Sequence, residues 1–583
     1  WIDERRAALE TKMRINLDVL AFNKGEENLY DRRQLKWARR WSAANPDLIN
    51  PDIHKFLQVS YNRNKRRLMK HIGIPTLIIC FSTISVIVWI QPFIQKRNFI
   101  HDILEPNILL NNVVLSGGGV DSLTTIEINQ FNFDVYNDNL KHFGNLNTMS
   151  LYSNPFLSDL SIIDNIKNPL LVDSLLIYFN PNLESLKGIE RLANLSSLTI
   201  KLNPKLANLS GIENLENLSS LTVDSNEILE NLFGIENLGN LTSLTIKENQ
   251  RLKGLSGIDN LYNLTSLQII DHPNLNDLSS IANLKNLTSL KLNGNSKLEY
   301  LSGIENLSNL TALTIDYNYI LENFTGIENL INLTSLSIQG GYNPKDLSGI
   351  ENLPKLTSLS VNGKTYSEFL MSVKNLRNLT SLTIYHDFSM HNLKSVENLG
   401  NLKSLTINFN ENLGRLYGFK NLGNIKSLTI DDTRNFLSLS GIENLKNLTS
   451  LVLRSNYHLD DLSGIDNLSN LTSLEISNER SFSNLTSIKK LNNLTSLICK
   501  KCALTNLSGI ENLKYLNKLI IKETGLKNLA GIEKLEKLTF LDISSNPNLK
   551  NFKALEQLTT LKVLVIDNRF DLDVELLKQN NPQ

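Results

Sequence analysis

Two closely spaced cysteines are the residues most suited to redox or metal chemistry. They stand in the segment Cys499-Lys-Lys-Cys502, far from the third cysteine, Cys80. A zinc site needs two further ligands, and the neighbouring segments do not supply them. Three cysteines also give no disulfide framework, so they do not indicate a redox compartment. We therefore expect Cys499 and Cys502 to be structural.

Acidic residues, histidines and glycines form no catalytic pattern. Asp431-Asp432 and Asp460-Asp461 are paired carboxylates of the kind that ligate calcium, but we interpret them as solvated turn residues. The eight histidines show no i, i+4 pair on a helix and no fixed serine or cysteine partner. Gly117–Gly119 lacks the lysine of a phosphate-binding loop. The sequence predicts no enzyme, no metal site and no cofactor.

Leucine recurs at a fixed period over most of the chain. Such a period is typical of a solenoid, in which each copy buries its apolar face only by stacking on its neighbours. Solenoids usually present a surface rather than perform chemistry, which favours binding. Fifteen leucines follow one another at an unbroken spacing of 23 residues: Leu175, Leu198, Leu221, Leu244, Leu267, Leu290, Leu313, Leu336, Leu359, Leu382, Leu405, Leu428, Leu451, Leu474 and Leu497.

Each copy has a recognisable pattern. In the copy that begins at Leu195, Leu, Leu, Ile and Asn stand at relative positions 1, 4, 6 and 9, and Ser-Gly-Ile-Glu-Asn-Leu follows at 210–215. This pattern resembles the leucine-rich repeat, and its continuation resembles the internalin-type short-repeat class, one residue longer than usual. The resemblance implies an α/β solenoid, a horseshoe with a parallel sheet on its concave side.

The spacing within a copy predicts where each side chain points. Leu198 and Ile200 face inward and Thr199 outward, because side chains on a strand have a period of two. Asn203 falls at the turn, where an inward amide satisfies backbone groups, and Gly211 permits the tight convex return. The Asn recurs at Asn180, Asn226, Asn249, Asn295, Asn318, Asn410, Asn456 and Asn546.

Weaker copies extend the array at both ends. We place them at Ile126 and Leu151, with spacings of 25 and 24, and at Leu519, Leu541 and Leu564. They bring the array to about twenty coils.

The repeat phase also accounts for two motifs. Cys499 occupies the inward Ile position and Cys502 the Asn position. The Asn-Leu-Ser/Thr sequons, such as those at Asn240 and Asn263, belong to the repeat and matter only in a eukaryotic secretory pathway.

The concave face is the expected binding surface. Its outward positions form one column of serines, from Ser197 to Ser381, and one of threonines, from Thr199 to Thr429. Uniform columns carry little information about a ligand, so the variable residues after the strands are the candidates. These recognition candidates are Tyr317, Tyr319, Tyr385, His386, Phe388, Phe409, Arg454, Tyr457 and His458.

Exposed aromatic and arginine side chains on a rigid frame are the usual anchors of protein recognition. The alternative interpretation of these residues is edge packing between coils. The expected ligand is a protein or a glycan. Basic residues do not gather into a stripe on the array, which argues against nucleic acid.

An apolar segment precedes the array. Residues 72–90 carry no charge, and the uncharged region extends over 71–95. As a helix it is long enough to cross a hydrocarbon core of about 30 Å. The sequence therefore predicts a transmembrane helix at 71–95, because a buried core helix would need long amphipathic partners that the chain lacks.

Charge gives this span a direction. The net charge of the chain is zero, but residues 1–70 hold 16 Lys+Arg against 9 Asp+Glu. A basic cluster lies directly before the span, and only Lys96 and Arg97 lie close behind it. The positive-inside bias predicts a cytoplasmic N-terminal segment and extracytoplasmic repeats, hence a single-pass membrane protein. The basic residues before the span are Arg63, Lys65, Arg66, Arg67 and Lys70.

The N-terminal segment is predicted to be helical, with Leu9, Met13, Leu17 and Leu20 at near-helical spacing. With Trp41 and the basic cluster, it resembles the segment before the membrane span of bacterial STAND-type signalling NTPases. The resemblance implies that this segment ends an upstream domain and that any NTPase activity lies upstream of this chain, which does not begin with Met.

These inferences give a predicted organisation. Residues 1–70 are a cytoplasmic helical segment, 71–95 a transmembrane helix, 96–120 a linker and cap, and 121–583 the repeat domain. The expected function is that of a membrane-anchored sensor or adhesion protein whose repeats bind a ligand. The alternative is a structural cell-surface repeat protein without a signalling role.

Overall fold

The computed structural model describes residue 38 and residues 124–129, 140–155, 157–321, 324–340, 348–362, 373–386 and 391–567. The chain divides into two units, Trp1–Ile103 and Leu104–Gln583. Apart from residue 38, the predicted helical segment, transmembrane helix and linker lie outside the described residues. Within the described residues, no helix is long and apolar enough to cross a membrane.

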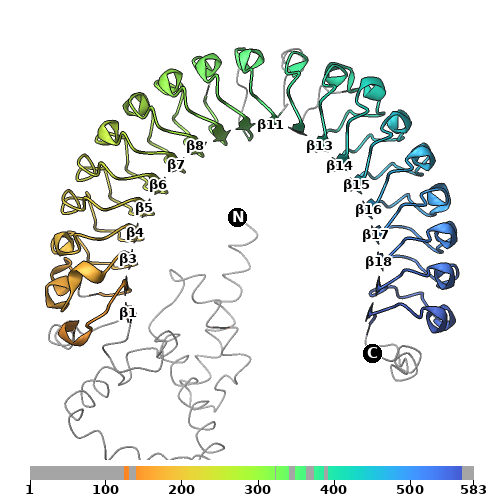
Figure 1. Ribbon diagram of the computed structural model, residues 1–583, viewed down its shortest axis with the longest axis horizontal. Coiled ribbons are helices and arrows are strands. Elements are labelled where there is room, and N and C mark those ends of the chain that lie inside the picture. Colours follow the sequence, from red (N-terminus) through yellow and green to blue (C-terminus); the bar gives the residue numbers. More distant parts are fainter. Residues whose placement is uncertain are drawn as a thin grey trace, which may run out of the picture. The chain divides into compact units, whose positions relative to one another are not determined.

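The described part of the second unit is an arc of stacked coils with the strands along its inner side (Figure 1). Twenty short strands form one sheet, and each pairs in parallel with the next strand of the chain. The strands are β1 (Thr125–Asn129), β2 (Thr148–Tyr152), β3 (Ser174–Tyr178), β4 (Ser197–Lys201), β5 (Ser220–Asp224), β6 (Ser243–Lys247), β7 (Ser266–Ile270), β8 (Ser289–Asn293), β9 (Ala312–Asp316), β10 (Ser335–Ile338), β11 (Ser358–Asn362), β12 (Ser381–Tyr385), β13 (Ser404–Asn408), β14 (Ser427–Asp431), β15 (Ser450–Arg454), β16 (Ser473–Ser477), β17 (Ser496–Lys500), β18 (Lys518–Lys522), β19 (Phe540–Asp542) and β20 (Val563–Val565).

Short 3-10 helices form much of the outer side of the arc (Figure 1). They are η4 (Leu140–His142), η5 (Ser161–Asn165), η6 (Pro169–Leu171), η7 (Ile189–Arg191), η8 (Ile258–Asn260), η9 (Ser279–Ile281), η10 (Ile304–Asn306), η11 (Ile327–Asn329), η12 (Ile350–Asn352), η13 (Lys394–Val396), η14 (Phe419–Asn421), η15 (Ile442–Asn444), η16 (Ile465–Asn467), η17 (Thr486–Ile488), η18 (Ile510–Asn512), η19 (Ile532–Lys534) and η20 (Lys553–Gln557).

The predicted glycine turn on the convex side is confirmed. Gly211 has a φ of 114°, and its N–H donates to Glu213 Oε2 at 2.7 Å, which explains why Glu follows two residues later. At the same position in a later coil, a Cβ on Gly441 would lie 2.6 Å from the carbonyl oxygen of Leu416. A side chain would therefore meet both strain and a clash.

The predicted alternation along the strands is also confirmed. In β4, Leu198 and Ile200 are buried, whereas Thr199 is half-buried on the outward side. The register pairs equivalent leucines across successive coils, so the core is a continuous stack of Leu and Ile layers.

One phase prediction is wrong. Leu151 pairs with Ile177, and Met149 is the residue that pairs with Leu175. Leu151 therefore fills the second inward position of its strand. The error arose because an apolar residue at either inward position satisfies the same alternation.

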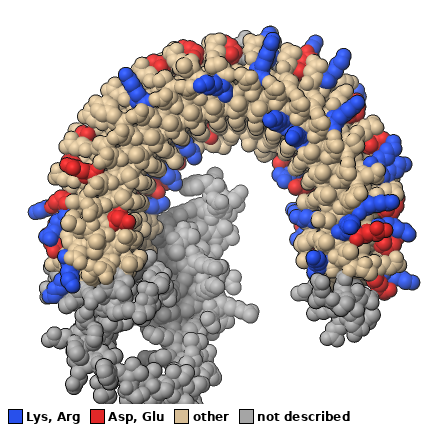
Figure 2. Space-filling view, viewed as in Figure 1, with Lys and Arg blue, Asp and Glu red and all other residues tan. Residues whose placement is uncertain are grey.

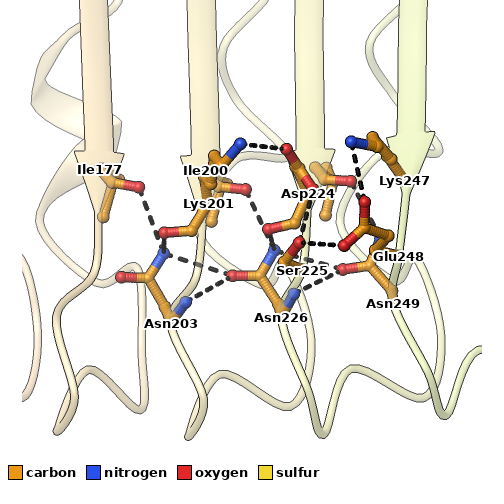
Figure 3. Close-up of polar contacts among 11 residues, drawn as sticks. Ile177, Ile200, Lys201, Asn203, Asp224, Ser225, Asn226, Lys247, Glu248 and Asn249 are labelled. Atoms are coloured by element: carbon orange, nitrogen blue, oxygen red, sulfur yellow. Dashed lines mark hydrogen bonds and ion pairs between the residues drawn. The ribbon is translucent and has the colours of Figure 1, made fainter. Parts of the chain in front are cut away.

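A ladder of asparagines joins the coils at the end of the strands (Figure 3). The backbone N–H of Asn203 donates to Asn226 Oδ1 at 3.0 Å, and Asn226 Nδ2 donates to the carbonyl oxygen of Ile200 at 3.0 Å. Asn226 N–H in turn donates to Asn249 Oδ1 at 2.9 Å. Each inward amide thus satisfies a donor and an acceptor of the preceding coil, as predicted.

The position that Asn203, Asn226 and Asn249 occupy in their coils is here called the ladder position. The residue before it adopts a left-handed backbone conformation. Leu202, Ser225 and Glu248 have φ values of 56°, 56° and 52°. This conformation is uncommon outside glycine and costs free energy. It turns the chain so that the N–H of Leu202 reaches the carbonyl oxygen of Asp224 at 2.9 Å and the next side chain faces inward.

Glu479 takes the ladder position in the coil after Asn456. Its Oε1 accepts the N–H of Asn456 at 2.9 Å and Asn456 Nδ2 at 3.0 Å. Its Oε2 is buried and has no hydrogen-bond partner among the described groups. Burial raises the pKa of Glu479 to about 8, against the opposing effect of the two hydrogen bonds from Asn456. The side chain is therefore largely neutral at pH 7, like the amide that it replaces.

The strand phase can be tested by two neighbouring substitutions. Leu313 is 1% exposed, so Leu313→Ala should lower the free energy of unfolding by about 2–5 kcal/mol. Thr314 faces outward, and Thr314→Ala should change it by less than about 0.5 kcal/mol. Chemical denaturation measures both, and equal losses would show that the phase is wrong.

The buried carboxyl predicts a pH dependence. The pKa of Glu479 is raised, so the folded chain holds a proton that the unfolded chain loses, and stability falls as pH rises from about 4.5 towards 8. Glu479→Gln should remove this loss. At pH 9 its free energy of unfolding should exceed that of wild type by on the order of a few kcal/mol. A stability difference between the two proteins that stays constant from pH 5 to pH 9 would contradict the assignment.

Candidate recognition surface

The concave sheet carries the predicted columns of small hydroxyls. In β5 and β6, Ser220, Thr222, Ser243 and Thr245 are half-buried on the outward side between inward leucines and β-branched residues. A surface of this kind is polar and even, so the places where larger side chains interrupt it are the candidate recognition sites.

Tyr385, His386 and Phe409 are three of the recognition candidates. They lie on adjacent coils and are here called the second aromatic patch. Tyr385 ends β12 and pairs with Asn408 of β13. The rings of His386 and Phe409 stack with centroids 4.7 Å apart and planes inclined by 12°. Phe409 is still 42% exposed, so the stack presents an open aromatic face. A further recognition candidate, Phe388, lies outside the described residues.

Tyr317 and Tyr319 lie apart from this patch, after β9. They are 47% and 43% exposed. The Tyr317 ring covers Gly340 of the next coil, where a Cβ would collide with the ring. Tyr317 therefore combines packing between coils with an exposed surface.

Arg454 and Tyr457 are engaged by neighbouring coils. Arg454 Nε donates to Glu475 Oε1 at 2.9 Å. Burial of Glu475 opposes ionisation, but the hydrogen bond and charge of Arg454 outweigh it and hold the pKa of Glu475 below its ordinary value. The guanidinium carbon of Arg480 lies 5.7 Å from the centre of the Tyr457 ring. These contacts fit the edge-packing alternative better than recognition. Arg454 and His458 are nevertheless both exposed.

Another cluster of exposed aromatic side chains was not among the recognition candidates. Because it lies earlier in the chain, it is here called the first aromatic patch. It consists of Tyr152 at the end of β2, Leu176 and Tyr178 of β3, and Phe179 directly after β3. The rings of Tyr152 and Tyr178 stack at 5.1 Å, and Phe179 is 49% exposed at 6.3 Å from Tyr178. The sequence feature that could have indicated this cluster is Leu176. It pairs with Thr199 and therefore lies in the outward column that threonine occupies in other coils.

Charges at the ends of β4, β5 and β6 neutralise one another (Figure 3). Lys201 Nζ lies 2.7 Å from Asp224 Oδ2, and Lys247 Nζ lies 2.8 Å from Glu248 Oε1. Ser225 Oγ donates to Asp224 Oδ1 at 2.7 Å. On the face of the arc shown in Figure 2, basic and acidic side chains are mixed, and neither sign forms a continuous stripe.

The cysteines lie at the two positions that the repeat phase predicted. Cys499 and Cys502 are buried and form no disulfide. Burial raises the pKa of the Cys499 thiol, with a further contribution from the neighbouring Cys502. Among the residues that the structure describes, no group of three or more His, Cys, Asp or Glu side chains is placed to hold a metal ion.

Comparison with known proteins identifies the fold. No protein-family model and no curated protein matches the chain. TLR13 in complex with ssRNA13 is similar over 78% of this chain and 72% of that chain, with 20% identity and a TM-score of 0.52. Mouse RP105 in complex with MD-1 is similar over 76% and 86%, with 18% identity and a TM-score of 0.51.

A bacterial leucine-rich-repeat protein is also similar. The protein from Leptospira interrogans is 24% identical over 71% of this chain and 95% of that chain, with a TM-score of 0.44. The parallel sheet of the described coils, together with the similarities to TLR13 and RP105, shows that the chain has the leucine-rich-repeat fold.

Proposed function

We propose that the chain is a membrane-anchored recognition protein that binds a protein ligand on the concave face of its repeats. The observation that carries this proposal is the pair of aromatic patches that interrupt an otherwise polar sheet. Phe179 and Phe409 are both more than two-fifths exposed. Rigid, exposed aromatic side chains supply large contact areas at a low entropic cost.

The fold alone does not choose the ligand. RP105 is in complex with MD-1, whereas TLR13 is in complex with ssRNA13. The charges on the surface of this chain are therefore used to choose between a protein and a nucleic acid. On the face shown in Figure 2 no basic stripe is present, and at the ends of the concave strands Lys201 and Lys247 are paired with Asp224 and Glu248. Because a phosphate backbone favours a stripe of unpaired basic residues, these charges support a protein over a nucleic acid.

The proposal includes the membrane anchor. The uncharged run at 72–90 would span the bilayer, and the basic excess before it would place residues 1–70 in the cytoplasm. The repeats would then lie outside the cytoplasm and report to an NTPase upstream of this chain, as the resemblance of residues 1–70 suggests. A structural surface protein is the alternative, and it requires no ligand-dependent signal.

Recognition is tested by a pull-down with the full chain. Tyr385→Ala with Phe409→Ala, or Tyr152→Ala with Phe179→Ala, should weaken ligand binding by at least about 2 kcal/mol per anchor and leave the melting temperature unchanged. Tyr300→Ala is the matched control, because Tyr300 is 49% exposed but lies outside both patches. Capture of the same proteins with the same affinity by wild type and both double variants would contradict the proposal.

Anchoring is tested by extraction of membranes. The full chain should resist alkaline carbonate, and Ile79→Arg with Ile84→Arg should release it, since each arginine costs about 2.5–3.5 kcal/mol at mid-bilayer on insertion scales. Release of the unmutated chain by carbonate would show that residues 72–90 do not span the membrane.

A further inference from the structure

A polar groove runs along the edge of the sheet where strands β7 to β11 begin, at the opposite end of the strands from the aromatic residues that follow them. It has a volume of about 600 Å³ and is open to solvent. It is lined by Asn263, Thr265, Asn286, Thr288, Asn309, Thr311, Asn332, Thr334 and Lys355.

The asparagines of the groove each make one bond to the preceding coil. Asn286 Nδ2 donates to the carbonyl oxygen of Tyr262 at 2.8 Å, and Asn309 Nδ2 donates to that of Lys285 at 2.9 Å. An amide carries two N–H groups and a carbonyl oxygen. This bond therefore fixes the amide and leaves one donor and one acceptor for a ligand at Asn263, Asn286 and Asn309. At Asn332 only a donor is left, because its Oδ1 accepts from Lys355 Nζ.

The threonines are fixed in the same way. Thr288 Oγ1 donates to the carbonyl oxygen of Thr265 at 3.0 Å, and Thr311 Oγ1 donates to that of Thr288 at 3.0 Å. Because a hydroxyl has one hydrogen and two lone pairs, each threonine offers the groove only an acceptor. The polar groups of the groove are thus held rigid before any ligand binds.

The charge and shape of the groove select a class of ligand. Its lining contains no carboxylate, and its one cation, Lys355, already donates to Asn332 Oδ1 at 2.6 Å. The leucines between the lining residues, such as Leu287, are fully buried and offer no pockets for peptide side chains. The backbone N–H of Thr288 is already bonded to Thr265, so a peptide strand cannot add there.

Paired donors and acceptors that repeat at Asn263, Asn286 and Asn309, about 4.8 Å apart, suit a neutral chain with hydroxyl groups on every unit. We propose that this groove binds a neutral linear glycan, with sugar hydroxyls on the exposed amides of Asn286 and Asn309. The site is separate from the aromatic patches and does not depend on them.

The test is isothermal titration calorimetry of the full chain with cellohexaose, maltohexaose, chitohexaose and xylohexaose as probes. At least one of them should bind, and Thr288→Lys with Thr311→Lys should weaken it by about tenfold or more. Lysine is compatible with the fold at this position, because Lys403 and Lys426 occupy it in later coils.

Thr314→Lys is the matched control. Thr314 lies in the same coil as Thr311 but on the concave face, in the column where Lys291 occurs naturally. It should leave glycan binding unchanged. The proposal is overturned if no neutral hexasaccharide binds, if only a sulfated hexasaccharide or a peptide binds, or if the control weakens binding as much as the groove variant.

Discussion

The inward hydrogen bond at the end of each strand is the interaction on which the array depends. A coil that turns away from a parallel strand leaves one backbone N–H and one carbonyl oxygen inside the core, where an unpaired polar group is costly. The amide of Asn226 satisfies both, through its Oδ1 and Nδ2, and binds the preceding coil in doing so. Stability is thereby shared between neighbours rather than stored in each coil.

Departures from asparagine show what this position requires. His272 takes the same position, and its Nδ1 lies 3.1 Å from the carbonyl oxygen of Asn249. Burial lowers the pKa of His272, so the ring stays neutral. Glu479 stays neutral for the same reason, although burial raises the pKa of an acid. Each replacement is thus a polar side chain held in its uncharged form, because the core excludes an unpaired charge.

The same turn determines where recognition residues can stand. The residue before the ladder position must adopt a positive φ, and its side chain then leaves the strand at the rim of the concave face. Phe179, Tyr317, His386 and Phe409 all occupy this position, with φ values between 49° and 59°. Their backbone is fixed by the ladder next to them, so aromatic anchors at these positions are rigid without a dedicated support.

Much of this architecture could be predicted from the sequence, because the period and the alternation both follow from burial. The ladder asparagines and the inward leucines followed directly. The left-handed position could not be predicted, since Leu202, Ser225 and Glu248 share no chemical property and the strain is imposed by the neighbouring coil. The partner of Arg454 could not be predicted for a similar reason. The register places Glu475 opposite Val452, two residues before Arg454 on the same face of the sheet, and the long arginine side chain reaches it from there.

Leu176 shows why a surface site escapes a pattern based on hydrophobicity. A leucine in a leucine-rich array reads as core, yet the register places it opposite Thr199 on the outward side. The groove residues were interpreted only as part of the repeat signature. Asn286 and Thr288 do hold the coils together, but each has more hydrogen-bonding capacity than that task uses. Polar side chains that bind the neighbouring coil are held in a fixed orientation. Their remaining donors and acceptors are therefore presented in that same orientation to a ligand in the groove.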